Sequence, residues 1–232
     1  MVPDVVILAG GKGTRLSSVI RDIPKPMASI ANRPFLSQLL NQLQKAGFQK
    51  VIMSVGYKHE VIESYYGPNF KDIKVEYCIE HTPLGTGGGI RLALQQAATD
   101  DVLVINGDTF FDIDFSNFFT FHEHGKYDFS LALKPVAENT RYGSVQVNDS
   151  RITGFVEKGE QLNSGMINGG IYLVKRNRFL TQTSDTAFSL ETEYLETLYQ
   201  TGVLGGYIDD GYFIDIGIPE DYKIADEHFR TL

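Results

Sequence analysis

Apolar positions in the first half of the chain alternate between continuous runs and runs with helical spacing. The continuous runs at residues 5–8, 51–55 and 101–107 are typical of strands that are buried on both faces of a sheet. Between them, segment 34–46 has apolar residues at the spacing of an amphipathic helix, and Gly47 follows where that helix should end. Strands that alternate with helices predict an α/β fold, a Rossmann-like three-layer sandwich around a mostly parallel mixed sheet.

The second half of the chain adds elements with other patterns. Residues 142–147 alternate between apolar and polar side chains and lead through Asp149-Ser150 into residues 152–157, which predicts a hairpin. Residues 188–199 place apolar side chains on one helical face and glutamates toward water, which predicts an amphipathic helix. We also expect strands at 75–79, 129–133 and 168–173, and helices at 61–65, at 115–121 with His122 and His124 at a surface end, and after Pro219.

Composition and charge limit the classes of function. The chain has 232 residues, of which 42% are hydrophobic, enough for one well-buried domain that we expect to span residues 1–232. A net charge of -8 argues against a nucleic-acid partner. No stretch approaches the roughly 20 apolar residues of a membrane span. The single cysteine, Cys78, cannot form an internal disulfide, so we predict a cytoplasmic protein without a membrane partner.

A glycine-rich loop directly follows the first apolar run. It reads Gly10-Gly11-Lys12-Gly13-Thr14-Arg15, and its glycines allow backbone N–H groups to approach an anion. The loop lacks the third glycine of a dinucleotide fingerprint and the Lys-Ser/Thr pair of a Walker loop. Arg15, and Lys25 between Pro24 and Pro26, add cations suited to a polyphosphate. The alternative is an ordinary solvated turn, which the spacing of these cations makes the weaker interpretation.

Two further features point to the same crevice. A second glycine-rich stretch, Gly85-Thr86-Gly87-Gly88-Gly89, begins a helix and either approaches a base or an anion or forms a tight turn. Asp108 and Asp215 each end an apolar strand, and ligands of α/β sheets bind at the carboxyl ends of strands. Carboxylates are ligands of Mg²⁺, so we predict that these two converge on one Mg²⁺, although each could instead cap a turn or helix.

The glycine loop followed by Pro24-Lys25-Pro26-Met27 resembles the signature of the sugar-1-phosphate nucleotidyltransferases. The resemblance covers the whole chain and implies the nucleotide-diphospho-sugar transferase fold, without the C-terminal β-helix that many members carry. It implies that a nucleoside triphosphate and a sugar 1-phosphate are the substrates and that Mg²⁺ assists. The sugar-phosphate oxygen would attack the α-phosphorus directly, so positioning and charge neutralisation would carry the catalysis. Whether the chain forms homo-oligomers is left open.

Loop chemistry and resemblance together assign the site. Arg15, Lys25 and Asp108 are the predicted catalytic residues, and Asp108 and Asp215 the metal ligands. The nucleotide is assigned to Leu8, Ala9, Gly10, Gly11, Gly13, Thr14, Arg15, Glu80, Gly85, Thr86 and Asp108. The sugar phosphate is assigned to Lys25, Gly143, Glu157, Lys158 and Asn168. The chain departs from the family at Gly159, where proline is frequent, and at Gly169, where the family has alanine.

Glu80 indicates which base is read. In the resembled family the residue at this point faces the Watson–Crick edge, and guanine offers a carboxylate two adjacent donors, so we predict GTP first, UTP second and CTP last. An exposed strand-end glutamate is the alternative.

Four other segments are similar to the branch of the family that uses heptose 1-phosphate: residues 18–28, 111–114, 167–172 and 209–217. Mannose 1-phosphate with GTP, N-acetylmuramate 1-phosphate with UTP, and a non-catalytic nucleotide-sugar-binding subunit remain as alternatives.

Overall fold

The computed structural model describes residues 2–11, 13, 16, 22–137, 142–156 and 165–231. The strands are β1 (Asp4–Leu8), β2 (Ser29–Ile30), β3 (Arg33–Pro34), β4 (Lys50–Val55), β5 (Asn69–Phe70), β6 (Ile73–Ile79), β7 (Asp101–Asn106), β8 (Thr109–Phe111), β9 (Phe129–Val136), β10 (Ser144–Asn148), β11 (Arg151–Val156), β12 (Gly165–Lys175), β13 (Leu204–Ile208) and β14 (Phe213–Asp215). The helical segments are η2 (Lys25–Met27), α1 (Phe35–Lys45), α2 (His59–Tyr66), α3 (Gly85–Leu94), α4 (Phe115–Gly125), α5 (Arg176–Gln182), η3 (Leu190–Leu195), α6 (Glu196–Leu198), η4 (Tyr199–Thr201) and α7 (Pro219–Arg230).

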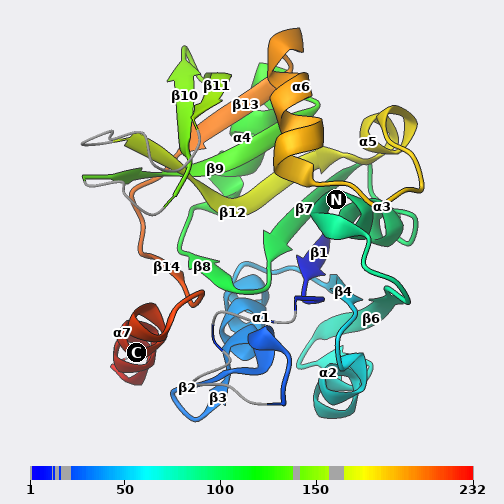
Figure 1. Cartoon of the computed structure of the whole chain (residues 1–232), viewed down its shortest axis with the longest axis vertical. Coiled ribbons are helices and arrows are strands. Elements are labelled where there is room, and N and C mark those ends of the chain that lie inside the picture. The colour runs from blue at the N-terminus through cyan, green and yellow to red at the C-terminus, as the bar shows by residue number, and fades with distance from the viewer. Residues whose placement is uncertain are drawn as a thin grey trace.

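A large mixed sheet forms the centre of the described structure (Figure 1). Its strand order is β10-β11-β13-β9-β12-β7-β1-β4-β6-β5. The strands β7, β1, β4 and β6 are mutually parallel, as the alternation of strands and helices predicts. Parallel pairing is less extensive in the other half, because β12 runs antiparallel to both β7 and β9. The short strands β8 and β14 pair with each other outside this sheet.

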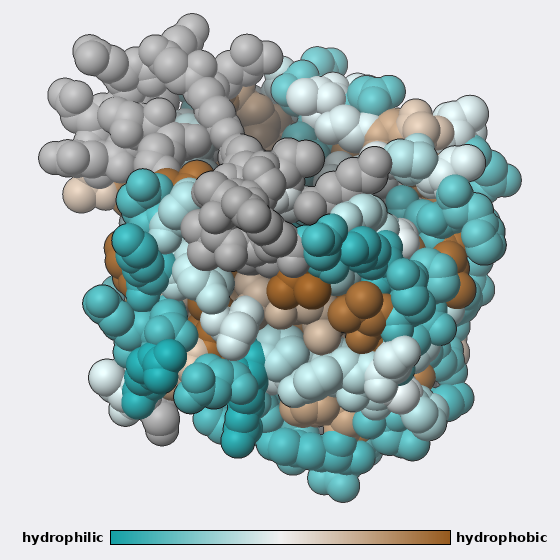
Figure 2. Space-filling view, turned by 60° about the horizontal axis from the view of Figure 1, so that its bottom comes forward, coloured by the Kyte–Doolittle hydropathy of each residue, from teal (hydrophilic) through white to brown (hydrophobic). Residues whose placement is uncertain are grey.

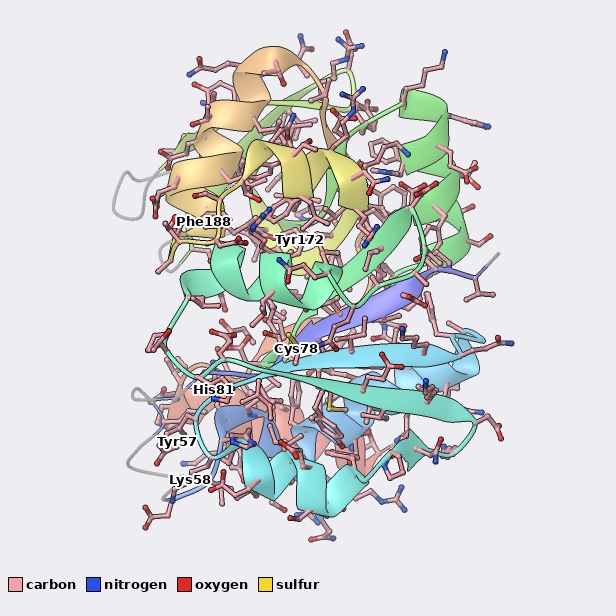
Figure 3. The ribbon with its side chains drawn as sticks, turned by 90° about the vertical axis from the view of Figure 1, so that its right-hand side faces the viewer. Tyr57, Lys58, Cys78, His81, Tyr172 and Phe188 are labelled. Atoms are coloured by element: carbon pink, nitrogen blue, oxygen red, sulfur yellow. The ribbon has the colours of Figure 1, made fainter. Side chains whose placement is uncertain are left out.

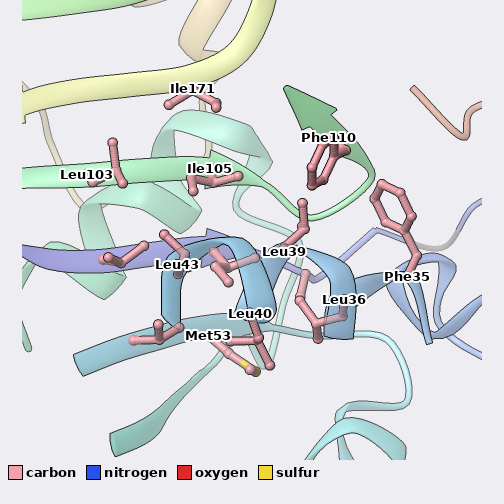
Figure 4. Close-up of a cluster of buried hydrophobic side chains, with 14 of the residues drawn as sticks. Phe35, Leu36, Leu39, Leu40, Leu43, Met53, Leu103, Ile105, Phe110 and Ile171 are labelled. Atoms are coloured by element: carbon pink, nitrogen blue, oxygen red, sulfur yellow. The ribbon is translucent and has the colours of Figure 1, made fainter. Parts of the chain in front are cut away.

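Each face of the sheet carries its own hydrophobic core. In β1, Val5 and Ile7 belong to one core and Val6 to the other, as expected for a strand whose successive side chains point to opposite faces. The first core contains side chains of α1, α2, α4 and α7, and the second those of α3, α5, η3 and α6. Figure 4 shows the first core, where Leu39 and Leu43 of α1 lie close to the central strands. The predicted three-layer α/β sandwich is confirmed.

Local sequence signals place several element ends. Gly47, with φ of 84°, follows α1 in the left-handed conformation that glycine adopts without strain. Asp114 caps α4, where its carboxylate accepts a hydrogen bond from the Asn117 N–H at 3.0 Å. The predicted hairpin is formed by β10 and β11, and Asp149 and Ser150 both adopt the positive φ of a two-residue turn. These are positions where one or two residues decide the backbone locally.

Two expectations were wrong in detail. Residues 188–199 do not form one regular helix, because the chain passes through the π-helix η3 and the short α6 into η4. His122 is not at the surface. Its ring is buried in α4, where Nδ1 lies 2.7 Å from the Ser130 hydroxyl and Nε2 lies 3.4 Å from the Asp101 carboxylate. The sheet therefore supplies a polar niche that the helix pattern alone does not reveal.

The ion pairs of Asp101 in this niche predict how the stability of the fold depends on pH in acid. The pKa of Asp101 is lowered from 3.8 to about 2, mainly by its hydrogen bond to the His122 imidazole. The Lys175 ammonium, 2.8 Å from Asp101 Oδ1, makes a smaller contribution in the same direction. A carboxyl whose pKa is lower in the folded state stabilises the fold above its unfolded pKa, and this stabilisation is lost as pH falls from about 4 to about 2. We expect Asp101→Asn to reduce the free energy of unfolding at pH 7 by about 2 kcal/mol. The difference from wild type should shrink toward pH 2.

Urea denaturation at a series of pH values measures this effect. Asp100→Asn is the matched control, because Asp100 is the neighbouring exposed carboxylate. An Asp101→Asn variant whose stability deficit is the same at pH 7 and pH 2.5 would contradict the assignment.

The surface shown in Figure 2 is largely hydrophilic, with hydrophobic residues gathered in small areas. Large hydrophobic side chains with high exposure among the described residues are Val2, Tyr65, Ile208 and Ile224. Within the ranges that the structure describes, no helix has the length and apolar character needed to cross a bilayer.

Candidate functional site

The site lies where the direction of strand addition reverses. From β1 the chain adds β4 and then β6 on one side, and then returns to add β7 on the other side of β1. The carboxyl ends of β1 and β7 therefore have connections that leave in opposite directions, and α/β sheets bind ligands in the crevice outside such strand ends. The first glycine loop follows β1, and Asp108 follows β7. The fold thus brings the two predicted features to one edge of the sheet.

Backbone hydrogen bonds fix the start of the glycine loop. The Ala9 N–H donates to the Ser54 carbonyl at 2.7 Å, and the Gly107 N–H donates to the Leu8 carbonyl at 2.9 Å. A Cβ at position 107 would lie 2.5 Å from the Leu8 carbonyl oxygen, so only glycine allows this approach. Gly107 therefore sets the distance between the loop and Asp108.

The Pro24-Lys25-Pro26 segment packs against the same loop. Gly13 has φ of 64°, and a Cβ there would lie 2.8 Å from the Lys25 Cβ. Pro24 precedes η2 and Pro26 lies in its first turn, where a fixed φ suits a helix start. Lys25 is buried, with only 9% of its side chain exposed. The two prolines thus flank a buried cation whose side chain packs against Gly13.

Lys25 joins the two predicted metal ligands. Its ammonium Nζ lies 2.5 Å from Asp108 Oδ2 and 3.6 Å from Asp215 Oδ1. Pairing of β14 with β8 places Asp215 opposite Thr109, and the Ile216 N–H donates to the Asp108 carbonyl at 3.0 Å. Residues 107 positions apart in the sequence therefore meet around one buried lysine.

The same two carboxylates fit a divalent cation. Mg²⁺ takes one or two protein carboxylates and completes its octahedron with phosphate oxygens and water. Asp108 and Asp215 remain 36% and 25% exposed, so a ligand can reach them from the crevice. Among the described residues, no cluster of three or more His, Cys, Asp or Glu side chains could hold a metal ion by itself. A metal held by these two carboxylates would complete its coordination with phosphate oxygens and water.

Glu80 lies between the two glycine-rich segments. Its Oε1 accepts a hydrogen bond from the Ser54 hydroxyl at 2.9 Å, and its Oε2 accepts one from the Leu84 N–H at 3.3 Å. A Cβ at Gly10 would lie 3.3 Å from Oε1, and one at Gly89 would lie 2.7 Å from it. The carboxylate is half-buried and held by these two hydrogen bonds, and its role toward a base stays a prediction.

Backbone hydrogen bonds join the second glycine segment to Phe188, just before η3. The Gly87 N–H donates to the Phe188 carbonyl at 3.1 Å, and the Phe188 N–H donates to the Leu84 carbonyl at 2.9 Å. A Cβ at Gly87 would lie 2.1 Å from the Phe188 ring. Figure 3 shows Phe188 near the start of α3, and Tyr57, Lys58 and His81 on the loops that follow β4 and β6. Phe188 was not expected from the sequence, and only the glycines opposite it hint at such a contact.

Thr86 contacts the first two residues of η3. Its hydroxyl accepts a hydrogen bond from the Leu190 N–H at 2.9 Å and lies 3.0 Å from Glu191 Oε2. The side chain is therefore occupied in holding the start of η3, and a direct role of Thr86 toward the nucleotide stays a prediction.

The predicted sugar side of the site is built on β12. The Asn168 amide donates to the Tyr172 hydroxyl at 2.9 Å, and its Oδ1 accepts from the Gly170 N–H at 3.0 Å. These bonds accompany a break in the β12 pairing between Asn168 and Tyr172, which turns the strand locally. At Gly169 a Cβ would lie 2.4 Å from the Phe111 ring and 2.9 Å from the Ala132 carbonyl oxygen. Glycine at this position therefore has a packing reason.

Some predicted residues lie outside the described part of the chain. They are Thr14, Arg15, Glu157 and Lys158, together with Lys12 and Gly159. Gly143 is described and lies just before β10, where a Cβ would be 3.1 Å from the Val156 carbonyl oxygen. The roles of all these residues stay predictions.

Comparison with known proteins gives consistent relatives. A D-glycero-alpha-D-manno-heptose 1-phosphate guanylyltransferase from Aneurinibacillus thermoaerophilus is 44% identical over 227 residues, covering 98% of each chain. A protein of the same name from Campylobacter jejuni is 44% identical over 217 residues, covering 94% of this chain and 96% of the relative. The crystal structure of HddC from Yersinia pseudotuberculosis complexed with GMP-PN superposes with a TM-score of 0.87 at 41% identity, covering 98% of this chain and all of that one.

The resemblance in sequence motifs is confirmed by these relatives and by a family model. The model of the nucleotidyl transferase family matches residues 4–231, which is nearly the full length. With the fold, the crevice at the strand reversal and the relatives in agreement, the chain belongs to the nucleotidyl transferase family.

Proposed function

We propose that this enzyme joins GTP to D-glycero-α-D-manno-heptose 1-phosphate, giving GDP-heptose and pyrophosphate. Two relatives that match nearly the whole chain carry the name of that guanylyltransferase. The crystal structure of HddC is a complex with GMP-PN, which by its name is a guanine nucleotide. The observation that carries the proposal is the convergence of Lys25, Asp108 and Asp215 in the crevice, with Glu80 between the two glycine segments nearby.

The geometry suits direct displacement at phosphorus. An oxygen of the sugar phosphate forms a bond to the α-phosphorus of GTP, and the bond from that phosphorus to the bridging oxygen of the leaving pyrophosphate breaks. The attacking phosphate is already ionised at neutral pH, so the chain does not need to supply a nucleophile or remove a proton. Its contribution is to position both substrates in line and to offset their negative charge.

Each described residue has a part in that arrangement. Lys25 brings a buried positive charge to the crevice, where it can offset charge on the reacting phosphates. Asp108 and Asp215 would hold Mg²⁺, which when bound supplies further neutralisation of phosphate charge. Glu80 would accept the N1–H and 2-amino protons of guanine. Asn168 and Gly143 would contact the sugar phosphate from the β10–β12 side of the sheet.

The cellular setting belongs to the same proposal. Cys78 is buried in β6, and burial raises the pKa of its thiol to about 11, so it is an inert packing residue. A free thiol of this kind suits the reducing cytoplasm, where we place the enzyme. We retain the expectation of one domain over residues 1–232.

The choice of base tests the proposed function. We expect pyrophosphate release with heptose 1-phosphate to favour GTP over ITP and over UTP by more than about tenfold in kcat/KM, because ITP lacks the 2-amino group and UTP offers one donor. Glu80→Gln should reduce the preference for GTP, since an amide presents one acceptor and one donor where guanine has two donors.

Glu76→Gln is the matched control, because Glu76 lies on β6, the strand that leads to Glu80, but pairs with Lys50 and Lys74. Equal use of GTP and ITP by the wild-type enzyme would argue against guanine recognition. Parallel assays with mannose 1-phosphate test the choice of sugar, and a faster reaction with that sugar would overturn the heptose assignment.

A further inference from the structure

Ser54 is the one polar residue in the buried part of β4, residues 51–55. The strand β4 reads Lys50-Val51-Ile52-Met53-Ser54-Val55, and Ser54 has no exposed surface. A buried hydroxyl without a partner is costly, so its place in a core strand calls for a specific hydrogen bond. The partner is the Glu80 carboxylate at 2.9 Å, and the Gly89 carbonyl oxygen lies at 3.5 Å.

The surroundings of this pair leave room for little else. Glycines occupy three neighbouring positions: Gly10, Gly56 and Gly89. A Cβ at Gly89 would lie 2.7 Å from Glu80 Oε1 and 3.3 Å from the Ser54 hydroxyl. The Ser54 hydroxyl therefore contacts the Glu80 carboxylate from the buried strand β4. The absence of side chains at the neighbouring glycines leaves room for the carboxylate between the first and second glycine-rich segments.

We propose that Ser54 is a positioning residue for guanine recognition: its hydroxyl orients the Glu80 carboxylate that reads the base. The inference rests on the proposed function of Glu80. Ser54 occupies one lone pair of Oε1, and the Leu84 N–H occupies one of Oε2. Each carboxylate oxygen has a second lone pair, so the two oxygens remain able to accept the two parallel donors of guanine in a fixed plane.

The main chain of Ser54 serves the same site. Its carbonyl accepts the Ala9 N–H at 2.7 Å, which anchors the first glycine loop, and the Glu80 N–H donates to the carbonyl of the next residue, Val55, at 2.7 Å. A substitution at Ser54 that keeps the backbone leaves these bonds intact. Loss of the hydroxyl should therefore affect the orientation of Glu80 and leave the loop in place.

The test compares Ser54→Ala with a matched control. Ser130→Ala removes another fully buried serine hydroxyl from a sheet strand, one that is bonded to His122 away from the glycine loops. We expect Ser54→Ala to lower the ratio of kcat/KM for GTP to that for ITP by about tenfold, through KM, with kcat for GTP nearly unchanged. Ser130→Ala should leave this ratio as in wild type while lowering stability.

A double-mutant cycle separates positioning from general destabilisation. If Ser54 acts through Glu80, Ser54→Ala should have no further effect on the GTP to ITP ratio in a Glu80→Gln background. Ser54→Cys, which fills the hydroxyl position with a weak S–H donor, replaces the alanine variant if the latter does not fold. A wild-type enzyme without GTP preference would refute the proposed function, whereas a wild-type preference that survives both Ser54 variants would refute this inference alone.

Discussion

Replacing Lys25 by alanine is expected to lower kcat/KM for pyrophosphate release by about a hundred- to a thousandfold, which corresponds to about 2.7 to 4 kcal/mol of transition-state stabilisation. The reason is the position of its ammonium, which belongs to a buried side chain and lies within 4 Å of both acidic residues of the crevice. Negative charge on the phosphates must be offset as the new bond forms, and a dry site strengthens each charge interaction.

Lys50→Ala is the matched control for this substitution. Lys50 is also partly buried, with 22% of its side chain exposed, and it pairs with Asp4 and Glu76 instead of the crevice residues. We expect this control to retain turnover. Circular dichroism and thermal denaturation establish that Lys25→Ala is folded, and a folded Lys25→Ala enzyme with near-normal turnover would overturn the role of this lysine.

Asp108→Asn and Asp215→Asn should each weaken the binding of a divalent cation by at least about tenfold and reduce turnover by about a hundredfold or more. Asparagine keeps the size of the side chain and removes the charge that a hard cation requires. Mn²⁺ binding in the presence of GTP, followed by electron paramagnetic resonance, measures the first effect without relying on activity.

Asp112→Asn is the matched control for both variants. Asp112 lies a few residues beyond Asp108 with its side chain exposed to solvent. Its replacement should leave Mn²⁺ binding unchanged. Mn²⁺ affinity that is the same in wild type, Asp108→Asn and Asp215→Asn would exclude the two carboxylates as ligands, and full activity in excess chelator would exclude a metal altogether.

The parallel half of the fold follows from the sequence because its signals are local. A strand buried on both faces must be apolar throughout, so residues 5–8 and 101–107 are readable as strands without knowledge of their neighbours. The helix at 34–46 is equally visible, since burial of one face imposes its own spacing. The site edge then follows from topology, because loops after parallel strands share one end of the sheet.

The other half depends on contacts that the sequence does not display. In β13, Gly205 and Gly206 weaken the strand pattern, yet a Cβ at either would lie within 3 Å of Tyr127 or Leu133. Those two glycines are therefore strand residues for a tertiary reason. The burial of His122 has a similar cause, because Ser130 and Asp101 come from two different strands.

The candidate site divides in the same way. Gly13, Lys25 and Asp108 stand out by type and spacing, but the ion pairs that join Lys25 to Asp108 and Asp215 depend on the meeting of three distant segments. Ser54 carries a readable signal, since one hydroxyl interrupts an apolar strand. Its partner could not be inferred, because hydrogen bonds across parallel strands depend on the register of β4 and β6.

The packing at Gly169 has an evolutionary consequence. Alanine, the residue that related signatures carry, would place its methyl group 2.4 Å from the Phe111 ring, so the ring would have to move to accept it. Phe111 in turn is fully buried against Phe213, and its loss would leave a cavity. Positions 169 and 111 are therefore coupled: the alanine form requires a smaller or displaced side chain at position 111, and it also requires the Ala132 carbonyl oxygen, 2.9 Å from the added methyl group, to shift.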